Sequence, residues 1–500
     1  MTDHLERRTG LYHDSVTLMR VSASVKATAG VQEALIGMGT ELNLDLIART
    51  GFSLPDDVGP NDLLIALRAD DQAAIDAGLA AVQDTFAELE RAAGGAGGDG
   101  APEPPKTLTG AHRSHRTNLA VISVPGAHAF APAMEAIESG QSVMLFSDNV
   151  PVAQEIALKD AAAAHDVLVM GPDCGTAVVN GAALGFANVT RPGSVGVIAA
   201  SGTGAQQVMC LLEDAGTGVS HVLGLGGRDL SAEVGGRSAR QALAALAADP
   251  ATSSVLIVSK PADEQVVTDL GQQAAELGVD VHWATLSVDS PDLTAAVESA
   301  LTAMGAAVPT WTSHPAAGEQ LATGGSLRGL FCGGTLADEA MMIARQELGP
   351  IRSNIPLAVD LADHPDLACS GNEPLTGHSV IDFGDDEMTQ GRPHPMIDPS
   401  LRQDTIIAQG DDPSCAVLLL DLVLGHCAHP DPAPALAAAI TEARTRAAAA
   451  DRQLAAVVSV IGTDQDPQNR SAAIDALTAA GASVFVSNAR ATRHAVGLLR

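Results

Sequence analysis

Three loops of the sequence combine glycine with small hydroxyl residues at the start of a helical pattern. In GVIAASGTGAQQVMCLLEDAG (196–216), small and β-branched residues predict a buried strand, and apolar residues then recur at helical spacing. Apolar runs also precede Gly333 and Gly462, and none of the three loops matches a P-loop or a dinucleotide fingerprint. Free N–H groups at a helix start attract an anion, and glycine lets it approach closely. The pattern predicts anion binding by Ser201, Gly202, Thr203, Gly204, Gly333, Gly334 and Thr335.

A proton donor is expected in the stretch GRPHPMIDP (391–399), inside a region, 365–413, that has no clear periodicity. Long irregular segments in compact domains are often functional. His394 is the expected general acid, because an imidazole ordinarily titrates near neutrality. Asp398 is expected to orient it, and Arg392 to hold an anion through two hydrogen bonds. The alternative is that the prolines rigidify a surface turn around His394.

Other chemistry-bearing side chains support weaker predictions. Cys174 in GPDCGT is either a nucleophile or, as expected, a small residue that fits a tight turn. His426 and His429 have metal-like spacing but no acidic cluster near them, so no metal site is predicted. The six cysteines include no C-x-x-C pair, which favours reduced thiols over disulfides or zinc.

The elements that must position these residues alternate along most of the chain. Apolar runs separated by helical patterns predict parallel sheets covered on both faces, and therefore an α/β fold. Such runs occupy 119–124, 142–147, 166–170, 196–200, 253–259, 280–286, 327–332, 415–425 and 455–462. Before them, strands over 16–25 and 62–69 and helices over 29–48 and 71–92 are expected to form a small α+β unit. A Gly- and Pro-rich stretch beginning at Gly94 predicts a flexible linker.

Composition excludes several classes of partner. The net charge is −32 and no basic patch is visible, which argues against nucleic acid and anionic membranes. No apolar stretch approaches the roughly 18 residues that span a bilayer. The first residues, MTDHLERRTG, contain no apolar signal core, so a cytoplasmic location is expected.

Two stretches carry a resemblance to a known enzyme. VMGPDCGTAVVNGAALGFANVTRPGSVGVIAASGTGAQQV, followed by GLGGRDL, resembles the CoA-binding α subunit of succinyl-CoA synthetase. VVSVIGTDQDPQNRSAAIDALTAAG resembles the carboxy-terminal ligase domain of that enzyme's β subunit. With DSVTLMRVSASV and GRPHPMIDP included, nearly the whole chain resembles the FdrA family, which places these modules behind its own N-terminal domain.

The resemblance implies several Rossmann-like and flavodoxin-like parallel-sheet domains, as in succinyl-CoA synthetase, behind the small α+β domain. The predicted boundaries are an α+β domain over 1–93, a linker over 94–111, a CoA-binding-like Rossmann domain over 112–249, a flavodoxin-type domain over 250–312, a third α/β unit over 326–412 and a ligase-like domain over 413–500. It also implies a substrate or cofactor-like pocket lined by Asn149, Pro172, Asp173, Cys174, Gly175, Arg228, Gly462 and Thr463.

The chain lacks the histidine that is phosphorylated in the enzymes it resembles. The segment that would carry the phosphorylated histidine of the synthetases has none, and Ser259, Lys260 and Pro261 stand where its glutamate would be. FdrA-type proteins are implied to be a subunit of oxamate carbamoyltransferase in purine catabolism, in which phosphate attacks oxalurate and yields oxamate and carbamoyl phosphate. The alternatives are an acyl-CoA synthetase that binds CoA, or a non-catalytic scaffold. Either way, a small anionic substrate, further subunits and an oligomer are expected.

Overall fold

A computed structural model describes residues 1–500 except 10–14, 27, 41–42, 45–46, 49, 56, 60, 95–104, 288–289, 317–323, 362–363, 372–373 and 390–392. The chain divides into two compact units, Met1–Pro104 with Thr389–Pro393, and Pro105–Met388 with His394–Arg500. Most of the predicted linker, 95–104, lies outside the described residues. None of the described helices combines the length and apolar character needed to cross a bilayer.

The N-terminal unit is a three-stranded antiparallel sheet with two main helices. Its elements are β1 (Thr2–Thr9), α1 (Ser15–Lys26), β2 (Val31–Met38), β3 (Asp62–Ala69) and α3 (Gln72–Gly94). Strand β3 is central, and Ala69 is paired with both Thr2 of β1 and Val31 of β2. The strand and helix predicted over 62–69 and 71–92 are confirmed as β3 and α3.

Two predictions in this unit are wrong. The segment 16–25 is not a strand but lies in α1, and the helix expected over 29–48 contains β2. Leu18, Val21 and Val25 are buried at helical spacing and pack on the sheet, although the β-branched residues of the segment favour a strand. In β2, buried positions alternate along much of the strand, as expected for a half-buried strand.

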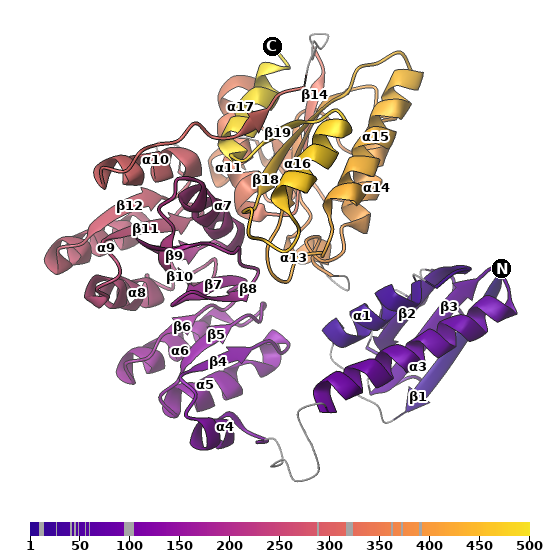
Figure 1. Cartoon of the computed structure of the whole chain (residues 1–500), viewed down its shortest axis with the longest axis horizontal. Coiled ribbons are helices and arrows are strands. Elements are labelled where there is room, and N and C mark those ends of the chain that lie inside the picture. Colours follow the sequence, from indigo (N-terminus) through magenta and orange to yellow (C-terminus); the bar gives the residue numbers. More distant parts are fainter. Residues whose placement is uncertain are drawn as a thin grey trace. The chain divides into compact units, whose positions relative to one another are not determined.

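The larger unit is α/β, as the sequence predicted, and its described strands form three sheets (Figure 1). The first is parallel, in the order β4-β5-β6. It consists of α4 (Leu108–His115), β4 (Leu119–Ile122), η1 (Gly126–His128), α5 (Phe130–Glu138), β5 (Ser142–Leu145), α6 (Val152–Ala164) and β6 (Val169–Met170).

The second sheet has the order β12-β11-β9-β10-β7-β8, with β9 to β12 parallel and β7 antiparallel to both neighbours. Its elements are β7 (Thr176–Val179), β8 (Ala182–Gly185), β9 (Pro192–Ala200), α7 (Gly202–Asp214), β10 (Val219–Gly224), α8 (Arg237–Ala248), β11 (Ser254–Ser259), α9 (Glu264–Leu277), β12 (Asp280–Ala284) and α10 (Leu293–Ala303). The predicted boundary between residues 249 and 250 falls inside this sheet.

The third sheet has the order β13-β19-β18-β17-β14-β16-β15 and is parallel except for β13. Its strands are β13 (Ser313–His314), β14 (Ser326–Phe331), β15 (Arg352–Ser353), β16 (Ser379–Asp382), β17 (Cys415–Val423), β18 (Ala455–Ile461) and β19 (Ser483–Phe485). The helical segments that follow or connect them are α11 (Gly334–Leu348), α12 (Ala358–Leu361), η2 (Pro365–Leu367), α13 (Asp386–Thr389), α14 (Ser400–Gln409), α15 (Ala433–Ala449), α16 (Arg470–Ala479) and α17 (Asn488–Gly497). The predicted boundary between residues 412 and 413 falls inside this sheet. The region 365–413 contains β16 and α14, so the expectation that it lacks regular structure is wrong.

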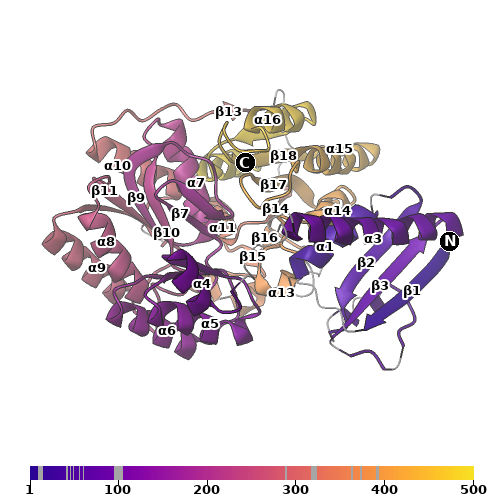
Figure 2. The same cartoon turned by 60° about the horizontal axis from the view of Figure 1, so that its bottom comes forward.

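Helices α7 and α11 lie between the second and third sheets in both views (Figures 1 and 2). One apolar core joins them, since it includes Val208 and Leu212 of α7 and Leu336 and Ala340 of α11. Each helix follows directly from the carboxyl end of a parallel strand, β9 or β14. In α/β sheets this is the edge at which ligands bind.

Candidate functional site

The start of α7 is organised by its N-cap residue, Ser201. The Ser201 backbone is extended, and its Oγ accepts a hydrogen bond of 2.9 Å from the Gly204 amide. The first backbone bond within the helix is donated by Ala205 to the Ser201 carbonyl. The N–H groups of Gly202 and Thr203 therefore have no acceptor within the helix and are available to a ligand.

The start of α11 is held by a buried carboxylate. Asp421, on β17, accepts hydrogen bonds from the amides of Cys332, at 2.9 and 3.2 Å, and Gly333, at 3.0 Å. Arg402 forms an ion pair of 2.8 Å with this carboxylate. The predicted anion contact of the Gly333 amide is wrong, because that amide already binds Asp421. Ala337 donates the first bond of the helix, so the amides of Gly334 and Thr335 lack an acceptor within it.

The two helix starts meet through side chains. The Ser201 hydroxyl donates a 2.6 Å hydrogen bond to the hydroxyl of Thr335. A Cβ placed on Gly333 would lie 2.8 Å from Oγ1 and 2.9 Å from Cβ of Thr203, so only glycine fits this contact without displacement. A Cβ on Gly204 would lie 3.0 Å from Cγ2 of Thr335. The structure thus brings Ser201–Gly204 and Gly333–Thr335 together, so two helix N-termini with partial positive charge lie side by side.

Two ionisable side chains lie against the first turn of α11. A Cβ on Gly334 would lie 2.6 Å from Oδ2 of Asp382 and 3.3 Å from Nζ of Lys260. Nζ of Lys260 forms an ion pair of 3.3 Å with Asp338, on the second turn of the helix. Burial alone would lower the pKa of Lys260, but the carboxylates of Asp338 and Asp382 raise it. The lysine therefore adds a fixed positive charge beside the two helix starts.

Asp382 is the acid of this group that holds a proton near neutrality. Its side chain is 4% exposed at the carboxyl end of β16, next to β14 in the sheet. Burial raises the pKa of Asp382 to about 7, even though Lys260 and the amide of Gly384 lower it. The Gly384 amide donates a 2.8 Å hydrogen bond to Oδ1 of Asp382, and Oδ2 is the oxygen that lies against Gly334.

Three carboxylates, Asp148, Asp173 and Asp386, lie within electrostatic range of Lys260 or of one another, and we call their surroundings the rim of the site. Close packing of its loop, together with the charges of Asp386 and Asp148, raises the pKa of Asp173 to about 6, although its side chain reaches solvent. Burial and the charges of Asp148 and Asp385 also raise the pKa of Asp386. Arg228 counters part of this charge. The rim therefore repels additional negative charge.

Arg228 is positioned by a buried network. It donates to the carbonyl of Val150 and forms an ion pair of 2.9 Å with Glu155. The other oxygen of Glu155 binds Lys159, which is fully buried and also contacts Asp229 at 2.7 Å. This network holds the GGRD turn against α6 and keeps the guanidinium of Arg228 at the rim.

His394 lies close to Asp382 but is not an acid near neutrality. A Cβ on Gly384 would lie 2.7 Å from Nε2 of His394 and 3.2 Å from Oδ1 of Asp382. Burial lowers the pKa of His394 to about 4, so its ring is neutral at pH 7. Nδ1 of His394 accepts a 3.2 Å hydrogen bond from the Met396 amide.

Asp398 and Arg392 are the two residues predicted to act together with His394. The carboxylate of Asp398 accepts hydrogen bonds from Ser400, at 2.6 Å from Oγ and 3.1 Å from the amide, and only its amide contacts the His394 carbonyl. The prediction that Asp398 orients the imidazole is therefore wrong. Arg392 lies outside the described residues.

The residues predicted around Cys174 form a tight turn at the rim. Cys174 is 1% exposed, and burial raises the pKa of its thiol to about 12, which supports the structural role over the nucleophilic one. Pro172 is buried, and a Cβ on Gly226 would lie 1.9 Å from its carbonyl oxygen. A Cβ on Gly185 would lie 2.3 Å from the carbonyl oxygen of Gly175. Asn149 is exposed.

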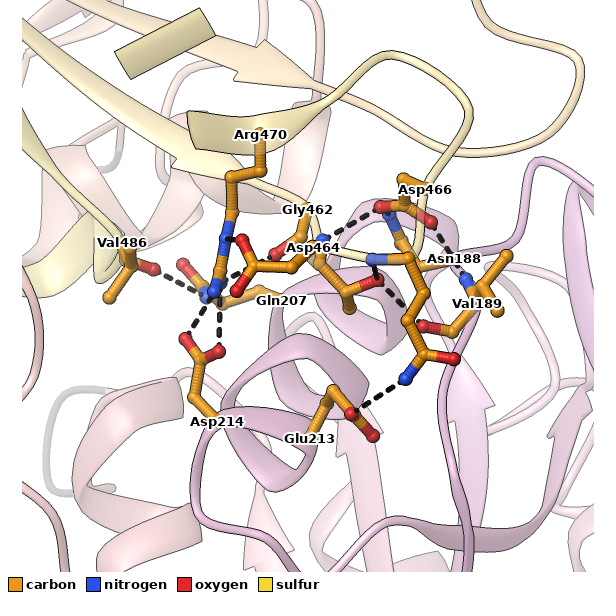
Figure 3. A network of polar contacts seen from close by, with 12 residues as sticks. Asn188, Val189, Gln207, Glu213, Asp214, Gly462, Asp464, Asp466, Arg470 and Val486 are labelled. Atoms are coloured by element: carbon orange, nitrogen blue, oxygen red, sulfur yellow. Dashed lines mark hydrogen bonds and ion pairs between the residues drawn. The ribbon is translucent and has the colours of Figure 1, made fainter. Parts of the chain in front are cut away.

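Gly462 (Figure 3) and Thr463 belong to an interface between elements and not to the pocket predicted for them. The Gly462 carbonyl accepts from Arg470, and the Thr463 hydroxyl donates to the Val189 carbonyl. The carboxylate of Asp466 accepts hydrogen bonds from Thr463, Val189 and the Asn188 side chain, at 2.7–2.8 Å. The pocket prediction fails here because these polar groups are already satisfied within the protein.

The same interface continues along α7. Arg470 binds both carboxylate oxygens of Asp214, at 2.8 and 2.9 Å. The Gln207 side chain donates to the Val486 carbonyl (Figure 3) and accepts from the Asn488 amide. These contacts fix α7 relative to the third sheet, which also carries α11.

Comparison with known proteins finds a relative that matches nearly the whole chain. A protein of Escherichia coli (strain K12), named Uncharacterized protein YahF, is 36% identical over 478 residues, covering 91% of this chain and 90% of its own. The chain belongs to the YahF family.

Two parts of this YahF-family chain match known protein families. Residues 1–103 match the family "AllF, heavy metal-associated domain", and residues 330–498 match the family "CoA-ligase". No cysteine occurs in residues 1–103. Across the described residues, no three His, Cys, Asp or Glu side chains gather as a metal ion would need.

Two relatives are subunits of succinate–CoA ligases. The mitochondrial subunit alpha-2 of Trichomonas vaginalis is 28% identical over 148 residues, covering 29% of this chain and 47% of its own. Subunit alpha 2 of Archaeoglobus fulgidus is 31% identical over 119 residues, covering 23% of this chain and 42% of its own. This chain therefore spans about half the length of these ligase subunits. A solved acetyl-CoA synthetase of Ca. Korarchaeum cryptofilum covers 79% of this chain at 15% identity, with a TM-score of 0.29 and 84% of its own chain covered.

Sequence reasoning missed the ionisable residues nearest to the helix starts. Lys260 was seen only as a replacement for a glutamate, and Asp382, Asp338 and Asp421 were not singled out. Lys260 directly follows the apolar strand β11, and Asp382 is the last residue of the apolar strand β16. A charged residue at the end of an apolar strand is the sequence feature that could have identified them. Asp421 lies inside a strand among apolar residues, where a lone carboxylate indicates a buried partner.

Proposed function

We propose that this chain binds phosphate between the N-termini of α7 and α11 and uses it in a CoA-ligase-type acyl transfer. The observation that carries the proposal is the 2.6 Å hydrogen bond from Ser201 to Thr335, because it directs two helix N-termini at one anion. Lys260, beside Gly334, adds positive charge to the same place. The match of residues 330–498 to the CoA-ligase family supports this reaction class.

In this reaction an oxygen of hydrogen phosphate forms a bond to the acyl carbon of a thioester. The carbon–sulfur bond breaks, CoA leaves as the thiol with the proton from phosphate, and an acyl phosphate remains. The reverse direction makes the thioester. The free amides of Gly202, Thr203, Gly334 and Thr335 would hold the phosphate oxygens, and the helix dipoles would stabilise its charge. Asn149, Pro172, Asp173, Gly175 and Arg228 remain the predicted contacts for the rest of the substrate or cofactor.

A second candidate is the phosphorolysis of oxalurate, and the acidic rim favours it. CoA carries several phosphate charges, which the carboxylates of Asp148, Asp173 and Asp386 would repel, whereas oxalurate carries one carboxylate and several N–H donors. Phosphate would bond to the carbamoyl carbon and the carbon–nitrogen bond would break. The proton of hydrogen phosphate would pass to the nitrogen of oxamate, with carbamoyl phosphate as the other product. The resemblance to the FdrA family also supports this candidate, with further subunits as partners.

Phosphate binding measured by calorimetry tests the proposal shared by both candidates. Ser201→Ala removes the cap and the link to Thr335, and we expect phosphate affinity to fall about five- to thirtyfold, the effect of losing about 1–2 kcal/mol of hydrogen bonding. Thr335→Val should lower the affinity in the same direction. The matched control is Thr107→Ala, because Thr107 caps α4 by accepting from the Gly110 amide at 3.0 Å. Equal affinity in wild type and Ser201→Ala would refute the phosphate site.

Product formation separates the two candidates. Wild-type protein, with its partner subunits added, is given phosphate and either oxalurate or acetyl-CoA, and the acyl phosphate is trapped with hydroxylamine. Carbamoyl phosphate from oxalurate supports the second candidate, and acetyl phosphate from acetyl-CoA supports the first.

A further inference from the structure

Asp382 lies against the first residue of α11. Its Oδ2 lies 2.6 Å from the Cβ position of Gly334, the first residue of α11, and its Oδ1 is fixed by the Gly384 amide at 2.8 Å. One oxygen is therefore anchored by the turn, and the other faces the helix start. The side chain is 4% exposed, which shields a proton held there from bulk water.

The backbone keeps Asp382 in this position independently of its charge. The side chain of Asn354 pairs with the Asp382 backbone, accepting from its amide at 2.9 Å and donating to its carbonyl at 2.8 Å. The next residue, Phe383, donates its amide to the Phe331 carbonyl at 2.8 Å, so β16 stays in register with β14. A change at the carboxyl group alone leaves these backbone contacts intact.

We infer that Asp382 is the proton-donating residue of this site, the group that protonates the atom displaced by phosphate. The inference rests on the proposed phosphate site. Asp382 would give its proton to the leaving nitrogen or sulfur as the bond to carbon breaks, and would take one from hydrogen phosphate, so that its own protonation is unchanged after one turnover. His394, the acid expected from the sequence, has a ring that is neutral at pH 7.

The ionisable groups around Asp382 determine how it responds to an anion. Lys260 comes from the end of β11, Asp338 from α11, Asp385 from the turn after β16, and His394 from the segment before α14. The pKa of Lys260 is raised and that of His394 is about 4, so neither changes charge between pH 7 and 8.5. An anion at the α11 N-terminus should therefore bind best when Asp382 is protonated, and should take up a proton when it is not.

Sulfate is the probe, since it keeps its charge across this range and cannot react. Calorimetry at pH 8, in two buffers with different heats of ionisation, gives the number of protons taken up on binding. We expect close to one proton per sulfate for wild type and none for Asp382→Asn. Between pH 7 and 8.5 the affinity of wild type should fall about fifteenfold in all, because about half of Asp382 is protonated at pH 7, and that of Asp382→Asn should fall by less than twofold. Asp382→Ser serves as a second variant should the amide disturb folding.

Asp249→Asn is the control, because Asp249 follows α8 at the amino edge of the second sheet, opposite to the site. It should take up protons as wild type does. Proton uptake by Asp382→Asn equal to that of wild type would overturn the inference, and so would sulfate binding by wild type without proton uptake, while the phosphate site would stand in both cases. No sulfate binding by wild type at any pH would overturn the site and the inference together.

Discussion

Replacing Gly333 with alanine should separate the two helix starts. The backbone of Gly333 has φ −117°, which any residue adopts, and the three atoms nearest to an added Cβ all belong to Thr203. The added Cβ would lie 2.8 Å from Oγ1 and 2.9 Å from both Cβ and Cγ2 of Thr203. Rotating Thr203 cannot relieve the contact with its Cβ, so one of the two loops must move.

The size of that movement gives the expected loss. Ordinary carbon contacts begin near 3.5 Å, so the loops must part by about 0.6–0.7 Å. The Ser201–Thr335 bond of 2.6 Å would then lengthen to about 3.3 Å, beyond the normal O–H···O range. We expect Gly333→Ala to lower the free energy of unfolding by about 2–4 kcal/mol, from overpacking and the lost hydrogen bond. Sulfate affinity should fall about fivefold, as when one helix dipole worth about 1 kcal/mol no longer faces the anion.

Urea denaturation and sulfate calorimetry measure both effects, and a second substitution identifies their cause. Thr203→Gly removes all three contacting atoms, so Gly333→Ala with Thr203→Gly should recover most of both losses, apart from about 0.5–1 kcal/mol for glycine in a helix. Thr203→Ala keeps the Cβ and should not rescue. Gly271→Ala, in α9, is the control for alanine itself, because no atom lies within 4 Å of its Cβ position. If Gly333→Ala unfolds and binds sulfate like wild type, or if the two substitutions add without rescue, the reasoning from the Cβ contacts is refuted.

Two further predictions concern buried carboxylates. Asp421→Asn should lower the free energy of unfolding in urea by about 3–5 kcal/mol, because it leaves the buried guanidinium of Arg402 unpaired; a loss below 1 kcal/mol would contradict this. Burial and the charge of Asp292 raise the pKa of Glu339 to about 7 from 4.5, so the folded state holds a proton that the unfolded state has lost. Its contribution to stability should therefore fall as pH rises from about 4.5 to 7, by up to about 1.4 kcal/mol per pH unit. Urea midpoints at pH 5, 6 and 7 should show a shallower fall for Glu339→Gln, and an unchanged slope would show that another group titrates.

Each helix start of the site could be predicted from the sequence, because its strand, its small polar loop and its helix follow one another along the chain. Ser201 and Thr335 were both selected on that ground, and both lie at helix starts after parallel strands. They are brought together by the packing of α7 on α11 across a sequence separation of 134 positions, which no local pattern contains.

The proton donor could not be predicted in the same way. His394 was selected for the ordinary pKa of imidazole, yet burial lowers that pKa to about 4 and raises that of Asp382 to about 7. Both shifts come from burial, and Asp382 is buried at the end of β16, which pairs with β14 and has only four residues, Ser379–Asp382. A four-residue strand in a segment without hydrophobic periodicity is too short for the sequence to show where it ends.

The polar interface of α7 with the third sheet (Figure 3) also determines when the site can form during synthesis. Asn188 bonds to Asp466 across 278 positions, Asp214 to Arg470 across 256, and Gln207 to Asn488 across 281. Contacts of such sequence separation form late, because closing the chain between them loses entropy before any bond is gained. A growing polypeptide can complete β9 and α7 early, but the polar groups of α7 that bind the third sheet have no partners until residues 462–488 have left the ribosome. Until then the polar groups of Asn188 and Gln207 stay hydrated, and the face of α7 that will meet the third sheet is open to chaperones.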